Sequence, residues 1–427
     1  MSLEKYRSDF ENCSRCSACK FIPLERVTDA EYTYGCPSIA RHNFHAYSGG
    51  GRLSVGSALL DGQLVHDQKV AEIAYDCLLC GSCDVSCKYG MDMEVLEPLE
   101  EIRTSCVDAG YTSPALDDLV KRARESSATW LQPGGIRISA ADLGAKDASC
   151  QRTEVLYHLG CQISHSGPLQ SIARSTVGLL QKAGLDVGVF GEGELCCGGR
   201  VLEWGYREEF AAQADRLLAS IRRSGAQLLV TSCAHCYQAL TVRYLQAGKE
   251  AGVRVVHAAD LLLELVEKGA LQVPSPGAVD VTYHDPCHLG RLGESFVPWQ
   301  GEPVPGHRRM YDPPKPWRRG ADGNYDSPRR LLDLASGGRL KEMRRIKEYA
   351  WCCGGGGGVP ESNAEFAAWT ANERIREARA TGAEILVTAC PTCRSMLSQG
   401  GTEAETALRV LDISEFLASV TGEEGEV

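Results

Sequence analysis

Short apolar runs alternate with long amphipathic stretches over residues 151–427. The runs at 227–232 and 384–389 are rich in β-branched residues and predict buried strands, and a cysteine directly follows each. The stretch 206–225 has apolar residues at helical spacing and ends at Gly225, a typical residue after the end of a helix. Alternating strands and helices favour parallel sheets, in which ligands lie beyond the carboxyl ends of the strands. The cysteines fall at those ends.

The same four segments occur twice in this region, in the same order. The matching pairs are 154–165 with 280–291, 194–205 with 349–361, 226–240 with 383–397, and 255–265 with 409–419. A repeated strand–helix order predicts two related α/β domains. We place them at 151–272 (repeat one) and 273–427 (repeat two).

Repeat two has an insertion at about 297–330. It is rich in Pro and Gly, so we expect it to lack regular structure and to run over the surface. It combines arginines with Trp299, Tyr311 and Trp317, a composition typical of interface anchors. We expect it to lie over or next to the repeat-two cysteines, where it docks a partner or limits access. The alternative is a passive surface insertion.

Composition narrows the class of protein. The 427 residues carry a formal net charge of −11, which argues against nucleic acid as the main partner. No segment approaches eighteen consecutive apolar residues, so we expect no transmembrane helix, and the first residues do not read as a signal peptide. We expect a cytoplasmic protein, for which membrane association would require a partner.

The 20 cysteines need an explanation of their own. Disulfide-rich proteins are usually small and secreted. This chain is long, lacks a secretion signal, and has its cysteines in C-x-x-C pairs, adjacent pairs and one eight-cysteine array. Metal ligation is therefore favoured over a disulfide framework.

The eight-cysteine array lies within residues 1–110 and contains two similar runs. The first run is Cys13, Cys16 and Cys19, followed by Cys36; the second is Cys77, Cys80, Cys83 and Cys87. A C-x2-C-x2-C loop brings three thiolates to one 4Fe–4S cubane, and in two-cluster ferredoxins the fourth ligand comes from the other run. We assign Cys87 to the first run and Cys36 to the second. Two four-thiolate zinc sites are the alternative.

The array departs from the ferredoxin pattern in two places. Sixteen residues separate Cys19 from Cys36, and Lys88 rather than Pro follows Cys87. The segment between the runs is helix-compatible, so the expected type is the helical ferredoxin.

Residues 111–150 read as a linker with one short helix. The predicted fold class is thus α+β multidomain: an N-terminal α-helical two-cluster ferredoxin domain followed by two pseudo-symmetric α/β domains.

Each repeat contains five cysteines in the order Cys, Cys-Cys-Gly, Cys-x-x-Cys. They are Cys161, Cys196, Cys197, Cys233 and Cys236 in repeat one, and Cys287, Cys352, Cys353, Cys390 and Cys393 in repeat two. Five thiols exceed the four that a zinc ion or a cubane takes, so they suit a ligand with several metals. The glycine after each adjacent pair permits close approach or a positive φ.

This tandem motif resembles the cysteine-rich CCG domain pair of the heterodisulfide reductase catalytic subunit. With the ferredoxin domain ahead of it, the chain resembles the fused, D-type form. The resemblance implies two cubane 4Fe–4S clusters and two noncubane 4Fe–4S clusters; in some members one repeat has zinc or a simpler cluster. In the archaeal reductase the noncubane clusters cleave the disulfide of coenzymes M and B. Related pairs occur in iron–sulfur subunits of glycolate and lactate oxidases and in bacterial electron-transfer complexes of anaerobic metabolism.

Other residues near the motifs are candidates for further roles. His165, His235, His284 and His288 lie beside cluster cysteines, and we select His288 as a candidate proton donor with Arg291 as a candidate anion contact. Each can instead be structural. Cys106 and Cys150 lie outside every motif and are read as spare thiols.

Two functions remain open. One is a redox enzyme subunit that reduces a disulfide at the repeats; the other is a pure electron-transfer subunit of a flavin- or acyl-CoA-linked complex. A structural protein that is stabilised by zinc ions and has no redox function is a third possibility. No flavin or nucleotide motif is visible, since the glycines at 191–193 and 354–358 lack the rest of those fingerprints. Electrons must therefore enter from a partner, such as a flavoprotein or a ferredoxin- or hydrogenase-type donor.

Overall fold

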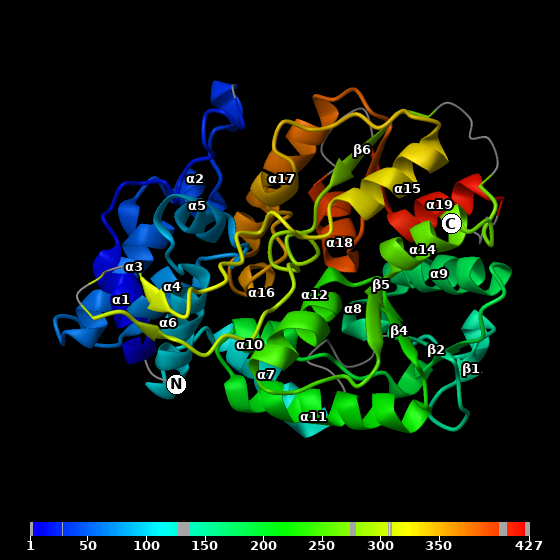
Figure 1. Cartoon of the computed structure of the whole chain (residues 1–427), viewed down its shortest axis with the longest axis horizontal. Coiled ribbons are helices and arrows are strands. Elements are labelled where there is room, and N and C mark those ends of the chain that lie inside the picture. Colours follow the sequence, from blue (N-terminus) through cyan, green and yellow to red (C-terminus); the bar gives the residue numbers. More distant parts are fainter. Residues whose placement is uncertain are drawn as a thin grey trace.

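The computed structural model describes residues 3–422 except 28, 127–136, 274–278, 306, 308–309 and 401–407. Figure 1 shows a helical N-terminal part in blue beside two α/β units in green and in orange to red. This arrangement confirms the predicted fold class. No helix in the described ranges has the length and apolar character needed to cross a membrane.

The N-terminal part is a bundle of short helices. They are α1 (Arg7–Asn12), α2 (Pro37–His42), α3 (Gly49–Leu60), α4 (Gln68–Tyr75), α5 (Ser82–Met91) and α6 (Leu96–Asp108). Their apolar faces share a core that includes Phe10, Leu53 and Leu99. The cysteine loops lie between these helices, so helix packing fixes their positions.

Repeat one contains a five-stranded parallel sheet with the order β1-β3-β2-β4-β5. The strands are β1 (Lys146–Asp147), β2 (Val155–Tyr157), β3 (Val187–Val189), β4 (Leu228–Thr231) and β5 (Arg254–His257). Its helices are α8 (Gly160–His165), α9 (Gln170–Lys182), α10 (Gly199–Glu203), α11 (Arg207–Ser224), α12 (Ala234–Gln238), α13 (Tyr244–Gln246) and α14 (Ala258–Glu267). As predicted, α11 stops at Gly225, whose φ is 69°.

The predicted linker is more structured than its sequence indicated. It contains α7 (Pro114–Ser126), the one short helix expected there. Its last residues also form β1, which pairs with β3 and extends the sheet of repeat one. A two-residue strand is too short to show the alternation of apolar and polar residues that predicts a strand from sequence.

Repeat two contains a three-stranded parallel sheet with the order β10-β9-β6. The strands are β6 (Val281–His284), β9 (Ile385–Thr388) and β10 (Arg409–Asp412). Its helices are α15 (Asp326–Ser336), α16 (Val359–Ser362), α17 (Ala364–Arg379), α18 (Pro391–Gly400) and α19 (Ile413–Val420). An isolated parallel bridge between Val281 and Leu340 stands where repeat one has β3.

The two repeats share one core. Helix α9 of repeat one packs on α19 of repeat two, and α14 of repeat one packs on α15 of repeat two. Apolar residues of both sheets, such as Tyr157 and Tyr283, belong to the same buried cluster. The two repeats therefore pack against each other through a shared apolar interface.

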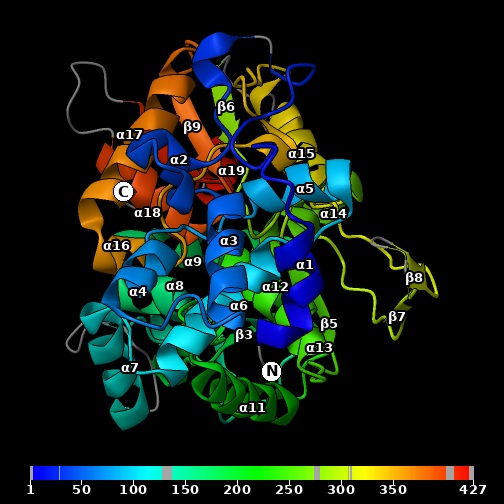
Figure 2. The same cartoon turned by 90° about the vertical axis from the view of Figure 1, so that its left-hand side faces the viewer.

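The insertion differs from its prediction. It contains two short antiparallel strands, β7 (Glu302–Pro303) and β8 (Tyr311–Asp312), which stand out at the right of Figure 2. Lys315 bonds Glu94 (Nζ–Oε1 3.0 Å) and Arg319 pairs with Asp92, so part of the segment packs on the ferredoxin-type part. Its later part lies against repeat two: Arg318 donates to the carbonyls of Leu292 and Glu294, and Gly320 lies over Arg291. Arg308 and Arg309 lie outside the described residues.

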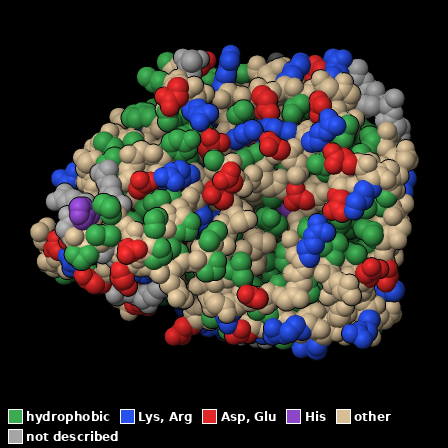
Figure 3. Space-filling model, viewed as in Figure 1, with side chains coloured by type: hydrophobic (Ala, Val, Ile, Leu, Met, Phe, Trp, Pro, Cys, Tyr) green, Lys and Arg blue, Asp and Glu red, His purple; other side chains and the backbone are tan. Residues whose placement is uncertain are grey.

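The face of the molecule in Figure 3 has acidic and basic side chains interspersed. It shows no broad area of one charge.

Candidate metal centres

The two ferredoxin-type runs have the same unusual backbone conformation. Arg15 and Leu79, each two residues after the first cysteine of its run, have φ values of 57° and 45°. Ser17 and Gly81, each following the second cysteine, have φ values of 70° and 77°. Left-handed residues at these positions are costly outside glycine and mark functional loops. They let each chain wrap around a common centre with its thiols inward.

The fourth cysteine of each run lies beside thiols of the other run. Cys36 lies just before α2 and is buried beside Cys80 and Cys77. Burial, and to a smaller extent these two thiols, raises the pKa of Cys36 to about 12. Cys87, on α5, lies near Cys19 and Cys13, and burial with these neighbours raises its pKa. The ligand assignment itself stays a prediction.

The start of α3 lies between the two runs. A Cβ at Gly50 would stand 3.3 Å from the Cys13 Sγ, and a Cβ at Gly49 would stand 3.3 Å from the Cys83 Sγ. The Gly50 N–H donates to the Cys19 Sγ at 3.3 Å. Glycine here leaves room for bulk next to both sets of thiols and supplies a backbone donor to an anionic group.

The repeat-one thiols form a buried chain of contacts at the carboxyl ends of β2 and β4. Cys161 contacts Cys196, which contacts Cys197. Cys197 contacts Cys236, which in turn contacts Cys233. A Cβ at Gly160 would meet the Cys236 Sγ at 2.9 Å, so only glycine fits beside this cluster.

The repeat-two thiols form an equivalent chain that links to two other sites. Within the repeat, the contacts join Cys287, Cys352, Cys353, Cys393 and Cys390 in that order. Cys390 also contacts Cys233 of repeat one, and Cys352 contacts Cys80 of the second ferredoxin run. The second ferredoxin run, repeat two and repeat one are therefore adjacent in series.

The donor sets fit iron–sulfur clusters. None of the 20 cysteines, all of which lie within the described ranges, forms a disulfide. Contact with Cys352 lowers the pKa of Cys80 to about 6, with help from Arg291 and against the effect of burial. Contact with Cys352 likewise lowers the pKa of Cys287. Buried thiols that converge in groups of four or five are the donors that iron–sulfur clusters require.

A buried acid–histidine group joins the two repeats beside Cys287. The His288 Nδ1 lies 3.2 Å from the Cys287 Sγ, and its Nε2 lies 2.6 Å from the Glu203 Oε1. The His288 ring stacks on His235 with ring centroids 3.6 Å apart. Burial alone lowers the pKa of His288, but Cys287 and Glu203 outweigh it and raise the pKa to about 10. His288 therefore holds a proton next to a half-buried cysteine.

Arg291 has a different environment from the one expected of an anion contact. It is buried, and its N–H groups donate to the carbonyls of Cys80, Glu348 and Ala350 at 2.5, 2.7 and 2.8 Å. These bonds tie the second ferredoxin run to repeat two.

The remaining candidates have structural contacts. His165 Nδ1 lies 2.9 Å from the Ser164 Oγ, and His284 accepts from the Arg374 Nε at 3.0 Å while facing Cys353. Cys106 is fully buried in the helical core and Cys150 is exposed. Cys106 shares the apolar core of the ferredoxin-type part, and the Cys150 Sγ lies 3.6 Å from the Asp147 carbonyl.

Sequence reasoning missed two residues of this region. Glu203 lies six residues after the adjacent cysteines of repeat one yet contacts a histidine of repeat two. Arg103, on α6, is fully buried and bonds carbonyls of three different parts of the chain. A glutamate at the end of one helix and an arginine on an amphipathic helix give no signal in a single sequence.

Comparison with known proteins agrees with this architecture. Residues 155–241 and 319–398 match the family of the cysteine-rich CCG domain, and residues 9–91 match the 4Fe-4S dicluster domain. The D-type polypeptide of the dihydromethanophenazine:CoB--CoM heterodisulfide reductase of Methanosarcina mazei is 28% identical over 372 residues, covering 82% of this chain and 78% of that protein. A crystal structure of a hypothetical protein from Helicobacter pylori shares the fold, with a TM-score of 0.54 at 12% identity over 89% of this chain and 68% of that one.

Two bacterial relatives are longer than this chain. The EtfAB:quinone oxidoreductase of Syntrophomonas wolfei is 28% identical, covering 84% of this chain and 48% of that protein. The probable iron-sulfur-binding oxidoreductase FadF of Bacillus subtilis is 26% identical, covering 88% and 51%.

A helical dicluster domain joined to a pair of cysteine-rich domains defines an iron–sulfur oxidoreductase. Within that class, the chain contains a pair of CCG domains and is similar over most of its length to the D-type polypeptide of heterodisulfide reductase.

Proposed function

We propose that this chain carries electrons through two cubane clusters to two noncubane clusters and reduces a disulfide at the CCG pair. The observation that supports this order is the run of thiol contacts from Cys80 to Cys352 and from Cys390 to Cys233. The clusters, when bound, supply one-electron steps. The first ferredoxin run, with its exposed Cys16, is the proposed entry point for electrons.

The proposed site of chemistry is at Cys287. It is the one half-buried thiol among the ten in the two repeats, all of which lie in the described ranges. Disulfide reduction consumes two electrons and two protons and yields two thiols. His288, held by Glu203 and stacked on His235, places a proton beside this opening. It is the proposed proton donor to the thiolate that leaves.

The proposed role of Arg291 is electrostatic, and it does not include contact with the substrate. Its bonds to Cys80, Glu348 and Ala350 hold a positive charge between the second ferredoxin run and repeat two. The proposed electron donor is a flavoprotein or a ferredoxin- or hydrogenase-type partner, and any attachment to a membrane would come through such a partner.

A pure electron-transfer role is the second candidate. It is favoured by the bacterial relatives, whose names describe an EtfAB:quinone oxidoreductase and an iron-sulfur-binding oxidoreductase. In this case a quinone or flavoprotein replaces the disulfide as the acceptor.

One anaerobic experiment separates the two candidates. The protein is reduced with dithionite, freed of excess reductant, and mixed with the CoB–CoM heterodisulfide and with a simple aliphatic disulfide. Reoxidation of the clusters with release of two thiols per disulfide supports the first function. Clusters that stay reduced with disulfides but are oxidised by a quinone analogue support the second.

A further inference from the structure

Three buried arginines surround the second ferredoxin run. The exposed fractions of Arg52, Arg103 and Arg291 are 2%, 0% and 4%. A buried guanidinium normally needs a carboxylate, because it loses its hydration. The other buried arginines of the described chain each have such a partner; they are Arg200, Arg243, Arg345 and Arg374.

The three arginines instead donate to backbone carbonyls. Arg52 bonds the carbonyls of Ile73, Asp76 and Tyr47. Arg103 bonds, among others, those of Cys77, Glu203 and Gly357. Arg291 bonds those of Cys80, Glu348 and Ala350. Over the described ranges, none of the three makes an ion pair, so their positive charge is not neutralised by a protein carboxylate.

Each of these cations lies within electrostatic range of a different thiol of the second run, and Arg291 is also within range of Cys287 and Cys352 of repeat two. Arg52 lies within electrostatic range of Cys36. Arg103 donates from Nη2 to the Cys77 carbonyl at 2.5 Å, and Arg291 donates from Nε to the Cys80 carbonyl at 2.5 Å. Three fixed charges therefore converge on one group of four thiols.

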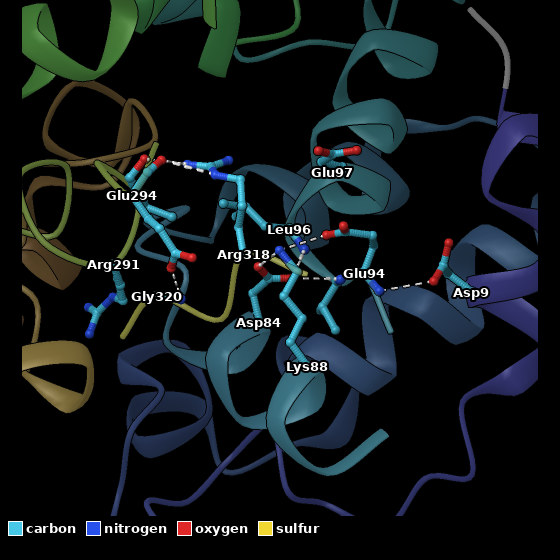
Figure 4. A network of polar contacts seen from close by, with 12 residues as sticks. Asp9, Asp84, Lys88, Glu94, Leu96, Glu97, Arg291, Glu294, Arg318 and Gly320 are labelled. Carbon is cyan, nitrogen blue, oxygen red and sulfur yellow. Dashed lines mark hydrogen bonds and ion pairs between the residues drawn. The ribbon is translucent and has the colours of Figure 1, made fainter. Parts of the chain in front are cut away.

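The first run has a different electrostatic setting. Cys16 is exposed and Cys13 is half-buried. The buried cation nearest in sequence to Cys87 is Lys88, whose Nζ lies 2.7 Å from Asp84 Oδ2 and 2.8 Å from Glu94 Oε2 (Figure 4). Lys315 is a second cation on Glu94, so the two lysines together balance the two carboxylates and leave no excess positive charge for the cysteines.

We infer that Arg52, Arg103 and Arg291 raise the reduction potential of the cluster bound by the second run and make it the electron acceptor of the ferredoxin pair. This inference rests on the proposed function. One electron leaves the first-run cluster, which is oxidised, and reduces the second-run cluster; no bond breaks. Reduction makes a four-thiolate cluster more negative, so nearby fixed cations stabilise the reduced form. Cys80, a proposed ligand of that cluster, contacts Cys352 of repeat two, which is where the electron would go next.

The test is a redox titration of the whole chain, poised with dithionite and followed by EPR. Arg103→Gln and Arg291→Gln keep hydrogen-bond donors but remove the charge, whereas Arg103→Lys and Arg291→Lys keep the charge. Arg207→Gln is the matched control, because it removes an arginine that is paired with Glu101 at the same domain boundary. Iron content of each variant is measured alongside.

Each Gln variant is expected to lower the ratio of reduced to oxidised cluster for one ferredoxin signal about tenfold at a fixed potential, a shift of about 59 mV for one electron. The Lys variants and Arg207→Gln should stay near wild type, and the affected signal should be the one reduced first in the wild type. If the Gln variants keep their full iron content and their reduction potentials do not change, the inference is wrong but the proposed function stands. The same holds if the shift affects the ferredoxin signal that is reduced last. Absence of any 4Fe–4S signal in the wild type would overturn the proposed function and the inference together.

Discussion

Cys80, from the second ferredoxin run, contacts Cys352, from the adjacent cysteine pair of repeat two. The two residues are 272 positions apart in the sequence, and Arg291 fixes the loop of Cys80 against repeat two. Electron transfer between neighbouring clusters needs short, rigid separations. This contact makes repeat two, and not repeat one, the proposed receiver of electrons from the ferredoxin domain.

The crossed ligand assignment predicts a selective loss. Cys36→Ala should remove the cluster of the second run and about four irons of about sixteen, because its fourth ligand is gone. The EPR signal of the first run should remain, and reduction of the clusters in the repeats should slow. Cys150→Ala, which changes an exposed thiol outside every motif, should retain full iron. Loss of the first-run signal in Cys36→Ala would show that the ligands do not cross.

The acid–histidine group predicts a kinetic defect without cluster loss. Glu203→Gln removes the carboxylate 2.6 Å from the His288 Nε2 and leaves a neutral partner. Turnover with a disulfide should fall about 10²-fold, the lower range for loss of a proton-transfer group. Iron content and the rate of cluster reduction by dithionite should match the wild type. Normal turnover in Glu203→Gln would mean that His288 is structural.

The insertion predicts a stabilising contact with the ferredoxin domain. Lys315 bonds the buried Glu94 and lies 4.3 Å from the ring centre of Trp317. Lys315→Ala leaves Glu94 with Lys88 alone and should lower the free energy of unfolding by about 1–3 kcal/mol. Arg330→Ala, in an exposed pair with Glu267, should change it by less than about 0.5 kcal/mol. Equal thermal stability of the two variants would show that the insertion is passive.

Asp9 predicts a pH-dependent contribution to stability. Burial raises its pKa to about 7, above the value of about 3.9 expected in the unfolded chain. The folded protein therefore retains a proton that the unfolded chain releases, so stability from this group falls as the pH rises from about 4 to about 7. Asp9→Asn removes this dependence and keeps an acceptor for the Glu94 N–H. Thermal unfolding should be measured at about pH 5.5 and about pH 7.5, and the stability of the variant relative to the wild type should be greater at the higher pH. An equal difference at both pH values would refute the raised pKa of Asp9.

The sequence predicted what depends on local spacing. The two cysteine runs repeat the same pattern, and the structure gives them the same left-handed residues. The strands that end before Cys233 and Cys390 are apolar runs in the sequence, and the structure contains both as β4 and β9. These strands lie in different sheets, so the contact between Cys233 and Cys390 comes from the packing of the two repeats.

What depends on tertiary contacts was not predictable. Glu203 and His288 come from different repeats, so no spacing relates them. The insertion was expected beside the repeat-two cysteines, but its composition does not encode that Lys315 reaches Glu94. The buried arginines resemble solvent-facing residues until the domains pack around them.

The central claim is that the chain binds four 4Fe–4S clusters. The most direct measurement is iron, acid-labile sulfide and zinc per chain in protein purified without oxygen. The account predicts about sixteen irons, about sixteen sulfides and no stoichiometric zinc, with about four irons and about four sulfides from each cluster. About eight irons accompanied by zinc would contradict it, because the CCG pair would then hold zinc rather than noncubane clusters.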